Sequence, residues 1–267
     1  IIKNLSNYTN KFPKGIHRVK ANFYLAEIYY KLKEFNKAIP YYEFIISKNS
    51  NQYTEDALVK LSDIFLKSNH FKKALPLLDR LEQEAHLAEN VLFAKSNLMK
   101  GYYETEAYKQ AIEYGHKILL KGKINTELEN NTKKIIARSS FKINDFINAE
   151  DYYTSIESTA KGELKAEVLY YLSFFKRKHK EYENSNKIIK DLIAKHASYK
   201  YWAVKSYVLM GKNYASLNDL YQATYVLENV IKNFPQFKDI IKEADKALRT
   251  LKTRQANKIS FVKSDNN

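Results

Sequence analysis

The sequence predicts an all-α solenoid of stacked antiparallel helix pairs, and two observations support this prediction. An aromatic residue or a leucine stands three positions before a small residue six times, and the small residues are 36, 37, 38, 36 and 38 positions apart. The six pairs are Phe35/Ala38, Phe71/Ala74, Tyr108/Ala111, Phe146/Ala149, Tyr182/Ser185 and Leu220/Ala223. Glycine and proline are scarce, with six and four in 267 residues, which favours helix throughout. A period of this length is typical of supersecondary units that pack on their neighbours.

A second marked site lies twelve positions before each small residue and follows an apolar residue. These sites are Ala26, Ser62, Met99, Ala137, Ser173 and Gly211, and five of the six are small. Small side chains let two helices cross closely, whereas a larger one at such a crossing costs about 1–3 kcal/mol through overpacking. Each unit is therefore predicted to be two helices that cross at these positions.

The helix pairs follow from this register. The first pair is expected at 19–32 and 36–48, where Pro40 lies in the first turn of the second helix and removes no needed amide hydrogen. The other pairs are expected at 53–67 with 71–85, 88–104 with 108–121, 126–142 with 146–159, 162–178 with 182–195, and 199–216 with 220–233. The residues expected to turn the chain or cap a helix within a pair are Asn69, Asn144, Asp145, Asn218 and Asp219.

The two ends of the chain differ from the six repeats at 19–236. Residues 1–18 contain Phe12-Pro13, like Phe234-Pro235 at the end of the sixth repeat, and are predicted to be the second helix of a truncated preceding repeat. Residues 237–256 predict an amphipathic capping helix with one charged face. Its apolar stripe is Ile240, Ile241, Ala244, Ala247, Leu248 and Leu251. Residues 257–267 are expected to be a polar, mobile tail.

Composition narrows the classes of function. The net charge is +15, but the excess is spread along the chain, whereas a nucleic-acid reader usually has a clustered basic patch. A solvated lysine-rich surface is the interpretation that this favours, so nucleic acid is not the expected partner. The sequence has no apolar run of 18 residues or more, so it predicts no transmembrane segment. Cysteine is absent, which excludes disulfides but leaves the compartment open.

The repeat resembles the tetratricopeptide repeat. Leu25-Ala26 through Phe35-Asn36-Lys37-Ala38-Ile39 fits well, as does Met210-Gly211 through Phe234-Pro235. The fifth repeat departs most, because Ser185 replaces the usual alanine and Lys176 stands where a tyrosine is common. The resemblance implies a right-handed superhelix with a concave groove, and a non-catalytic scaffold for protein–protein interaction. The longer units that end in Phe-Pro are similar to those of bacterial envelope proteins of this family. This implies a location in the bacterial periplasm or at the outer-membrane periphery rather than the cytoplasm, and the truncated repeat at 1–18 predicts that the chain is the C-terminal part of a larger protein.

In this family the first helix of each pair lines the groove, which gives the predicted partner-binding residues. They are Lys100, Tyr103, Lys134, Arg138, Phe141, Lys142, Tyr170, Phe174, Arg177, Lys178, Lys205 and Lys212. Cations interleaved with aromatic rings suit an extended acidic peptide. The N-terminal half of the groove is expected to be more acidic, with Phe23, Glu27, Tyr30, Asp56, Asp63 and Leu66 facing inward.

Other functions stay open beside this one. The same basic groove could bind a polyanion, either nucleic acid or an anionic envelope surface, with an affinity that falls steeply with salt. An enzyme whose catalytic domain precedes these residues is a third reading, in which the repeats recruit substrate. Lys134 and Arg138 resemble the carboxylate clamp of chaperone-associated repeats, but Val59, Asp63 and Lys100 depart from the rest of it.

Signals for catalysis are weak. Glu113 and His116 have the spacing of metal ligands, but a di-iron bundle needs two such motifs and two further carboxylates. No glycine-rich phosphate loop or nucleophile–base pair stands out. Gly101, Gly115 and Gly211 are isolated and are predicted to be points of close helix packing. The sequence therefore predicts no cofactor, no metal and no enzymatic activity in these repeats.

Overall fold

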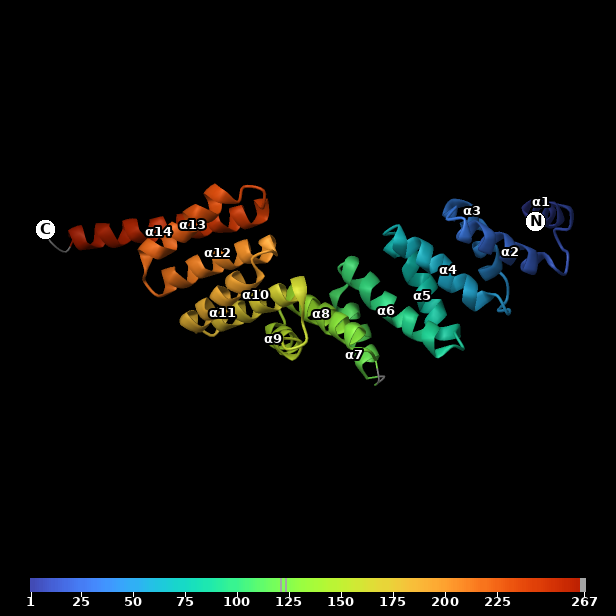
Figure 1. Ribbon diagram of the computed structural model, residues 1–267, viewed down its shortest axis with the longest axis horizontal. Helices are drawn as coiled ribbons and strands as arrows, with labels where there is room; N and C mark the ends of the chain where they lie inside the picture. The colour runs from blue at the N-terminus through green and yellow to red at the C-terminus, as the bar shows by residue number, and fades with distance from the viewer. Residues whose placement is uncertain (121, 123, 265–267) are drawn as a thin grey trace. The chain divides into compact units, whose positions relative to one another are not determined.

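The computed structural model describes residues 1–120, 122 and 124–264, and fourteen α-helices with no strand make up that part of the chain (Figure 1). The chain forms two compact units, Ile1–Phe146 and Ile147–Asn267, called here the first and the second unit. Within the described residues, no helix is both long enough and apolar enough to cross a membrane.

The first unit is a stack of helices in which each helix packs on the next one in the chain. Alternate helices also touch, α4 with α6 and α6 with α8, as expected of stacked antiparallel pairs. Its helices are α1 (Ile2–Lys11), α2 (Arg18–Lys31), α3 (Phe35–Ile46), α4 (Thr54–Lys67), α5 (Phe71–Glu84), α6 (Ala88–Glu104), α7 (Tyr108–Leu119) and α8 (Thr126–Lys142).

The second unit repeats this arrangement, with α10 touching α12 and α12 touching α14. Its helices are α9 (Phe146–Ser155), α10 (Gly162–Lys178), α11 (Tyr182–His196), α12 (Lys200–Ser216), α13 (Leu220–Asn233) and α14 (Lys238–Ser264). The boundary between the units divides the fourth predicted pair, since α8 belongs to the first unit and nearly all of α9 to the second.

In the six pairs and α14, the helix bounds agree with the sequence prediction to within two residues, except at two places. Helix α9 ends at Ser155, before the expected end at 159. Helix α14 continues to Ser264, so residues 257–264, expected as a mobile tail, are helical and the predicted end at 256 is wrong. The physical reason is that residues 238–264 contain neither glycine nor proline, and nothing local stops the helix.

One backbone conformation recurs in the six turns within the pairs. Lys33, Asn69, Glu106, Asn144, Lys180 and Asn218 have φ values between 57° and 65°. In the fifth turn the amide of Lys180 donates to the carbonyl of Arg177, and that of Glu181 donates to the carbonyl of Lys176. The other five turns have the same two bonds, which together form a Schellman motif. These residues have the spacing of the small residues in the sequence, so the sequence period is also the period of the backbone.

The predicted close crossings are confirmed. The small residues Ala38, Ala74, Ala111, Ala149, Ser185 and Ala223 are all fully buried. A Cβ atom on Gly115 would lie 2.5 Å from Ile136 Cγ1, and one on Gly211 would lie 2.8 Å from Leu227 Cγ. Gly101 would meet Leu75 Cδ2 at 2.9 Å in the same way. The three glycines therefore lie at points of close helix packing, as the sequence predicted, and a Cβ atom at any of them would make a neighbouring side chain shift.

Candidate functional site

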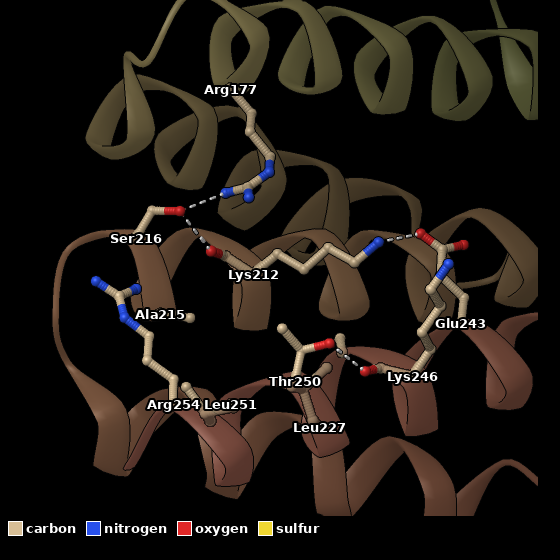
Figure 2. A pocket seen from close by; sticks show the side chains of 11 residues that line it. Arg177, Lys212, Ala215, Ser216, Leu227, Glu243, Lys246, Thr250, Leu251 and Arg254 are labelled. Carbon is tan, nitrogen blue, oxygen red and sulfur yellow. Dashed lines mark hydrogen bonds and ion pairs between the residues drawn. The ribbon is translucent and has the colours of Figure 1, made fainter. Parts of the chain in front are cut away.

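A pocket of about 530 Å³ lies in the second unit between α12, α13 and α14, with one further side chain from α10 (Figure 2). Buried or half-buried apolar residues form its floor, namely Ala215, Leu227, Ala247 and Leu251. Charged residues surround them, namely Arg177, Lys212, Glu243, Lys246 and Arg254. The pocket therefore combines an apolar floor with a rim that holds four cations and one carboxylate.

Helix α14 supplies one wall of the pocket. One face of this helix is buried in the unit, and a second face borders the pocket. Ile240, Ala244, Leu248 and Leu251 are buried and hold the helix against the rest of the unit. Glu243, Lys246, Thr250 and Arg254 follow one another at intervals of three or four residues, so their side chains share a face that borders the pocket.

The charges of the rim are not balanced. Lys212 Nζ lies 2.5 Å from Glu243 Oε1, so the single carboxylate of the pocket already has a cationic partner. Lys246 and Arg254 are exposed, and neither has an acidic partner at ion-pair distance among the described residues. An anionic group placed between them would therefore meet two cations that are not neutralised within the unit.

Arg177 closes the gap between α10 and α12 beside the pocket. Its Nη1 donates to Asn213 Oδ1 over 2.9 Å and to Ser216 Oγ over 3.1 Å. The guanidinium also lies over the ring of Tyr182, 5.4 Å from the centroid. Desolvation by burial lowers the pKa of Arg177. These contacts fix the side chain as a wall of the pocket.

The remaining predicted groove residues of the second unit have different surroundings. Tyr170 is buried, and its ring packs on Trp202 with the centroids 5.6 Å apart. Lys205 Nζ lies 5.1 Å from the Tyr170 centroid and is held over an aromatic cluster. Phe174 packs edge-on against Phe175. Lys178 is exposed at the end of α10. Of the predicted set, only Arg177 and Lys212 line the pocket.

The other half of the predicted set lies in the first unit. Tyr103 packs edge-on against Tyr108, and Phe141 against Phe146, with centroids 5.9 Å and 5.4 Å apart. Lys134 Nζ donates to Asn131 Oδ1 over 3.0 Å. Lys100 and Lys142 are exposed, and Arg138 is half-buried.

Two of the acidic residues expected at the N-terminal end of the groove accept hydrogen bonds from tyrosines of their own unit. Tyr42 donates to Glu27 Oε1 over 2.5 Å, and Tyr30 donates to Asp63. Burial raises the pKa of Asp56, and the charges of Glu27 and Glu55 raise it further. Glu27 is therefore bound within the first helix pair, and Asp63 joins that pair to the next one.

No group of three or more histidine or acidic side chains that could hold a metal ion occurs in the part of the chain that the structure describes. Glu113, singled out by its spacing from His116, forms an ion pair with Lys117 at 2.9 Å.

The sequence predicted a cap at α14 and did not single out the pocket residues of this helix. Each of the four residues of α14 that the structure describes as buried lies 38 positions after a buried residue of α12. The matching residues are Trp202 and Ile240, Ser206 and Ala244, Met210 and Leu248, and Asn213 and Leu251. Helix α14 therefore continues the repeat register in the place of a seventh first helix, and this signal was present in the sequence.

The comparisons with known proteins agree with this geometry. The family model described as Tetratricopeptide repeat matches residues 20–51. YrrB, described as a TPR protein with an unusual peptide-binding site, has a TM-score of 0.56 and 15% identity, over 75% of this chain and 96% of its own. BtubC from P. vanneervenii has a TM-score of 0.54 and 15% identity, over 85% of this chain and 91% of its own.

The apo form of RapI has a TM-score of 0.53 and 14% identity, over 90% of this chain and 99% of its own. No curated protein matches the chain. At these identities the solved structures establish the fold. Residues 20–51 match the tetratricopeptide repeat, and the described part of the chain has the fold of these solved structures.

Proposed function

We propose that this protein is a non-catalytic interaction scaffold that binds a peptide segment of a partner protein in the pocket of the second unit. The observation that carries the proposal is the combination of an apolar floor, made by Leu227 and Leu251, with the exposed cations Lys246 and Arg254. An apolar cavity with a few converging polar groups is the usual form of a binding site. Cations at its edge bind carboxylates through charge-assisted hydrogen bonds.

Two further observations support the proposal. The pocket is lined mostly by α10, α12 and α14, the helices that occupy the first place in each pair, and this is the surface from which the sequence analysis expected binding. The solved structure of YrrB, which shares the fold, is described as having a peptide-binding site.

The test is a selection from a displayed peptide library, followed by affinity measurements on the peptides that are enriched. The pocket variant is Lys246→Glu/Arg254→Glu. The matched control is Lys238→Glu/Lys242→Glu, which makes the same change of charge at two exposed residues of α14 outside the pocket. Selected peptides are expected to bind the wild type and the control alike and to lose at least about tenfold in affinity for the pocket variant. Equal binding to all three proteins would contradict the assignment of the pocket.

Polyanion binding is the second candidate, and the net charge of +15 is the observation that favours it. Binding of this kind releases counterions, so the affinity for single-stranded DNA or an anionic vesicle would fall steeply and log-linearly with salt. It would also weaken equally in the pocket variant and in its control, because both change the net charge by the same amount. Peptide binding in the pocket differs on both measurements.

A further inference from the structure

One position in each helix pair explains why the pocket exists. This position, called here the plug, lies three residues before the turn residue with positive φ. The residues at the plug are, in chain order, Tyr30, Leu66, Tyr103, Phe141, Arg177 and Ala215. The first five have large side chains and the sixth has a single methyl group.

Four of the five large plugs pack against the first residue of the next helix. Tyr30 contacts Phe35 with centroids 5.5 Å apart, and the guanidinium of Arg177 lies 5.4 Å from the centroid of Tyr182. Tyr103 and Phe141 pack on Tyr108 and Phe146 in the same way. In the sixth pair the corresponding residues are Ala215 and Leu220, so neither ring of this contact is present.

The plug of the fifth pair also shows which space is left open in the sixth. Arg177 reaches Asn213 and Ser216 on the next first helix. The repeat register places Leu251 and Arg254 at the same positions relative to Ala215, 38 residues further on, and both line the pocket. Figure 2 shows the short side chain of Ala215 at the edge of the open space. The pocket therefore lies where a plug side chain lies in the preceding pair.

We propose that the pocket takes an aromatic side chain of the partner, in the place that Tyr103 and Phe141 fill in their own pairs, and that Lys246 and Arg254 bind a carboxylate next to that ring. The partner segment is accordingly an acidic peptide with one aromatic anchor. This inference rests on the proposed function, since it names the chemistry of the peptide that the pocket binds.

The surroundings of the pocket favour a ring over the other plug types. A partner's arginine at the plug position of the sixth pair would face Lys246, Arg254 and Arg177. These like charges would repel it. A pocket of about 530 Å³ with leucine side chains in its floor accommodates a phenyl or phenol group, and aromatic rings bury the most apolar surface of all side chains.

The repeat register gives three cations of the pocket counterparts in the first unit, where the plug is a large side chain. Lys100, Lys134 and Lys142 lie 112 positions before Lys212, Lys246 and Arg254, and Tyr103 lies 112 positions before Ala215. By the repeat register, three of the four cations of the pocket therefore have counterparts on α6 and α8, and Tyr103 stands at the position of Ala215. Replacing Tyr103 with alanine is expected to open a second site of similar chemistry.

The test uses a fluorescein-labelled peptide rich in aspartate and glutamate with one phenylalanine, and a matched peptide with alanine in its place. Fluorescence anisotropy on the full chain is expected to show at least about tenfold tighter binding of the phenylalanine peptide. Ala215→Phe fills the pocket and is expected to remove that difference. Ala256→Phe, the same change at an exposed residue of α14 outside the pocket, is expected to keep it. The fluorescence of Trp202 in urea shows that both variants are folded.

The outcomes separate this inference from the proposed function. If both peptides bind the wild type equally and Lys246→Glu/Arg254→Glu abolishes binding, the aromatic anchor is wrong and the pocket remains a peptide site. If neither peptide binds the wild type, the acidic segment with an aromatic anchor is wrong, and the library selection decides separately whether the pocket binds another peptide. In the Ala215→Phe background, adding Tyr103→Ala is expected to restore preference for the phenylalanine peptide. A folded double variant without that preference would overturn the equivalence of the two places.

Discussion

Asn213 donates a hydrogen bond from Nδ2 to Ser185 Oγ over 2.8 Å in the interior of the second unit. The same Nδ2 donates to Asn186 Oδ1, and Asn213 Oδ1 accepts from Arg177. Ser185 in turn donates to the carbonyl of Ser173. The serine that departs from the repeat pattern is thus part of a polar network that links α10, α11 and α12.

Asn213→Ala is expected to lower the free energy of unfolding of the second unit by about 2–3 kcal/mol, because it leaves several buried polar groups without partners. Trp202 is the single tryptophan of the chain and lies in this unit, so its fluorescence in urea measures the change. Ser185→Ala, which restores the usual repeat residue, is the control and is expected to cost about 1 kcal/mol. Equal shifts in the two variants would show that Asn213 is not the centre of the network.

Lys180→Gly is expected to raise the free energy of unfolding of the second unit by about 0.5–1 kcal/mol. Lys180 has a φ of 65°, a conformation that costs about 1–2 kcal/mol for most residues but not for glycine. Asn218→Gly is the matched variant, and its gain should be smaller because asparagine tolerates this conformation. The urea midpoint of Trp202 fluorescence checks both. A lower midpoint for Lys180→Gly would contradict the prediction.

Gly115→Ala is expected to destabilise the first unit by about 1–3 kcal/mol despite the better helix propensity of alanine. The new Cβ would lie 2.5 Å from Ile136 Cγ1, and Ile136 is fully buried. Calorimetry of the two single variants and the double variant with Ile136→Ala tests the cause. The two changes are expected to be less than additive, because the smaller side chain makes room for the methyl group. Full additivity would place the strain elsewhere.

The contact between α12 and α14 is expected to weaken in alkaline solution. Burial, and after it the hydrogen bond to Asp239, raises the pKa of Tyr201 to about 12 from a usual value of 10.0. Between these values the unfolded chain loses a proton that the folded unit keeps, so this contribution to stability is complete below pH 10 and is lost as the pH rises to about 12. Urea midpoints measured from pH 9 to 12 should fall less steeply in Tyr201→Phe than in the wild type. Tyr221→Phe, at an exposed tyrosine of α13, is the control that keeps the wild-type slope.

Most of the fold could be predicted from the sequence because the repeat is marked by steric requirements. Ala38 and Ala111 are small where helices cross, and Asn144 and Asn218 occur where φ is positive. Such needs restrict the residue type at a fixed spacing and so appear in the sequence itself. The end of α14 could not be predicted, because this part of the sequence contains no glycine or proline that would stop a helix. The end then depends on packing and solvent exposure.

The candidate site was predicted only in part. Arg177 and Lys212 were expected to face a partner, and both line the pocket. Tyr170 was expected beside them, but its ring is buried against Trp202. A small error in the assigned face of a helix exchanges a groove residue for a buried one, because neighbouring positions around a helix differ in burial. Ala215 carried the missing signal: it is the one small residue in a column of large ones, and a cavity arises from what a side chain lacks.

The recurring backbone conformation of the six turns affects how binding specificity can evolve or be engineered in this chain. Tyrosine, leucine, phenylalanine, arginine and alanine all precede a turn by three residues, while φ at the turn varies by less than 10°. The turn conformation therefore does not depend on the residue three positions before it, although that residue decides whether a cavity is open. A single substitution at this position can create or remove a binding pocket in a helix pair. New specificities can therefore arise one substitution at a time in a chain that still folds.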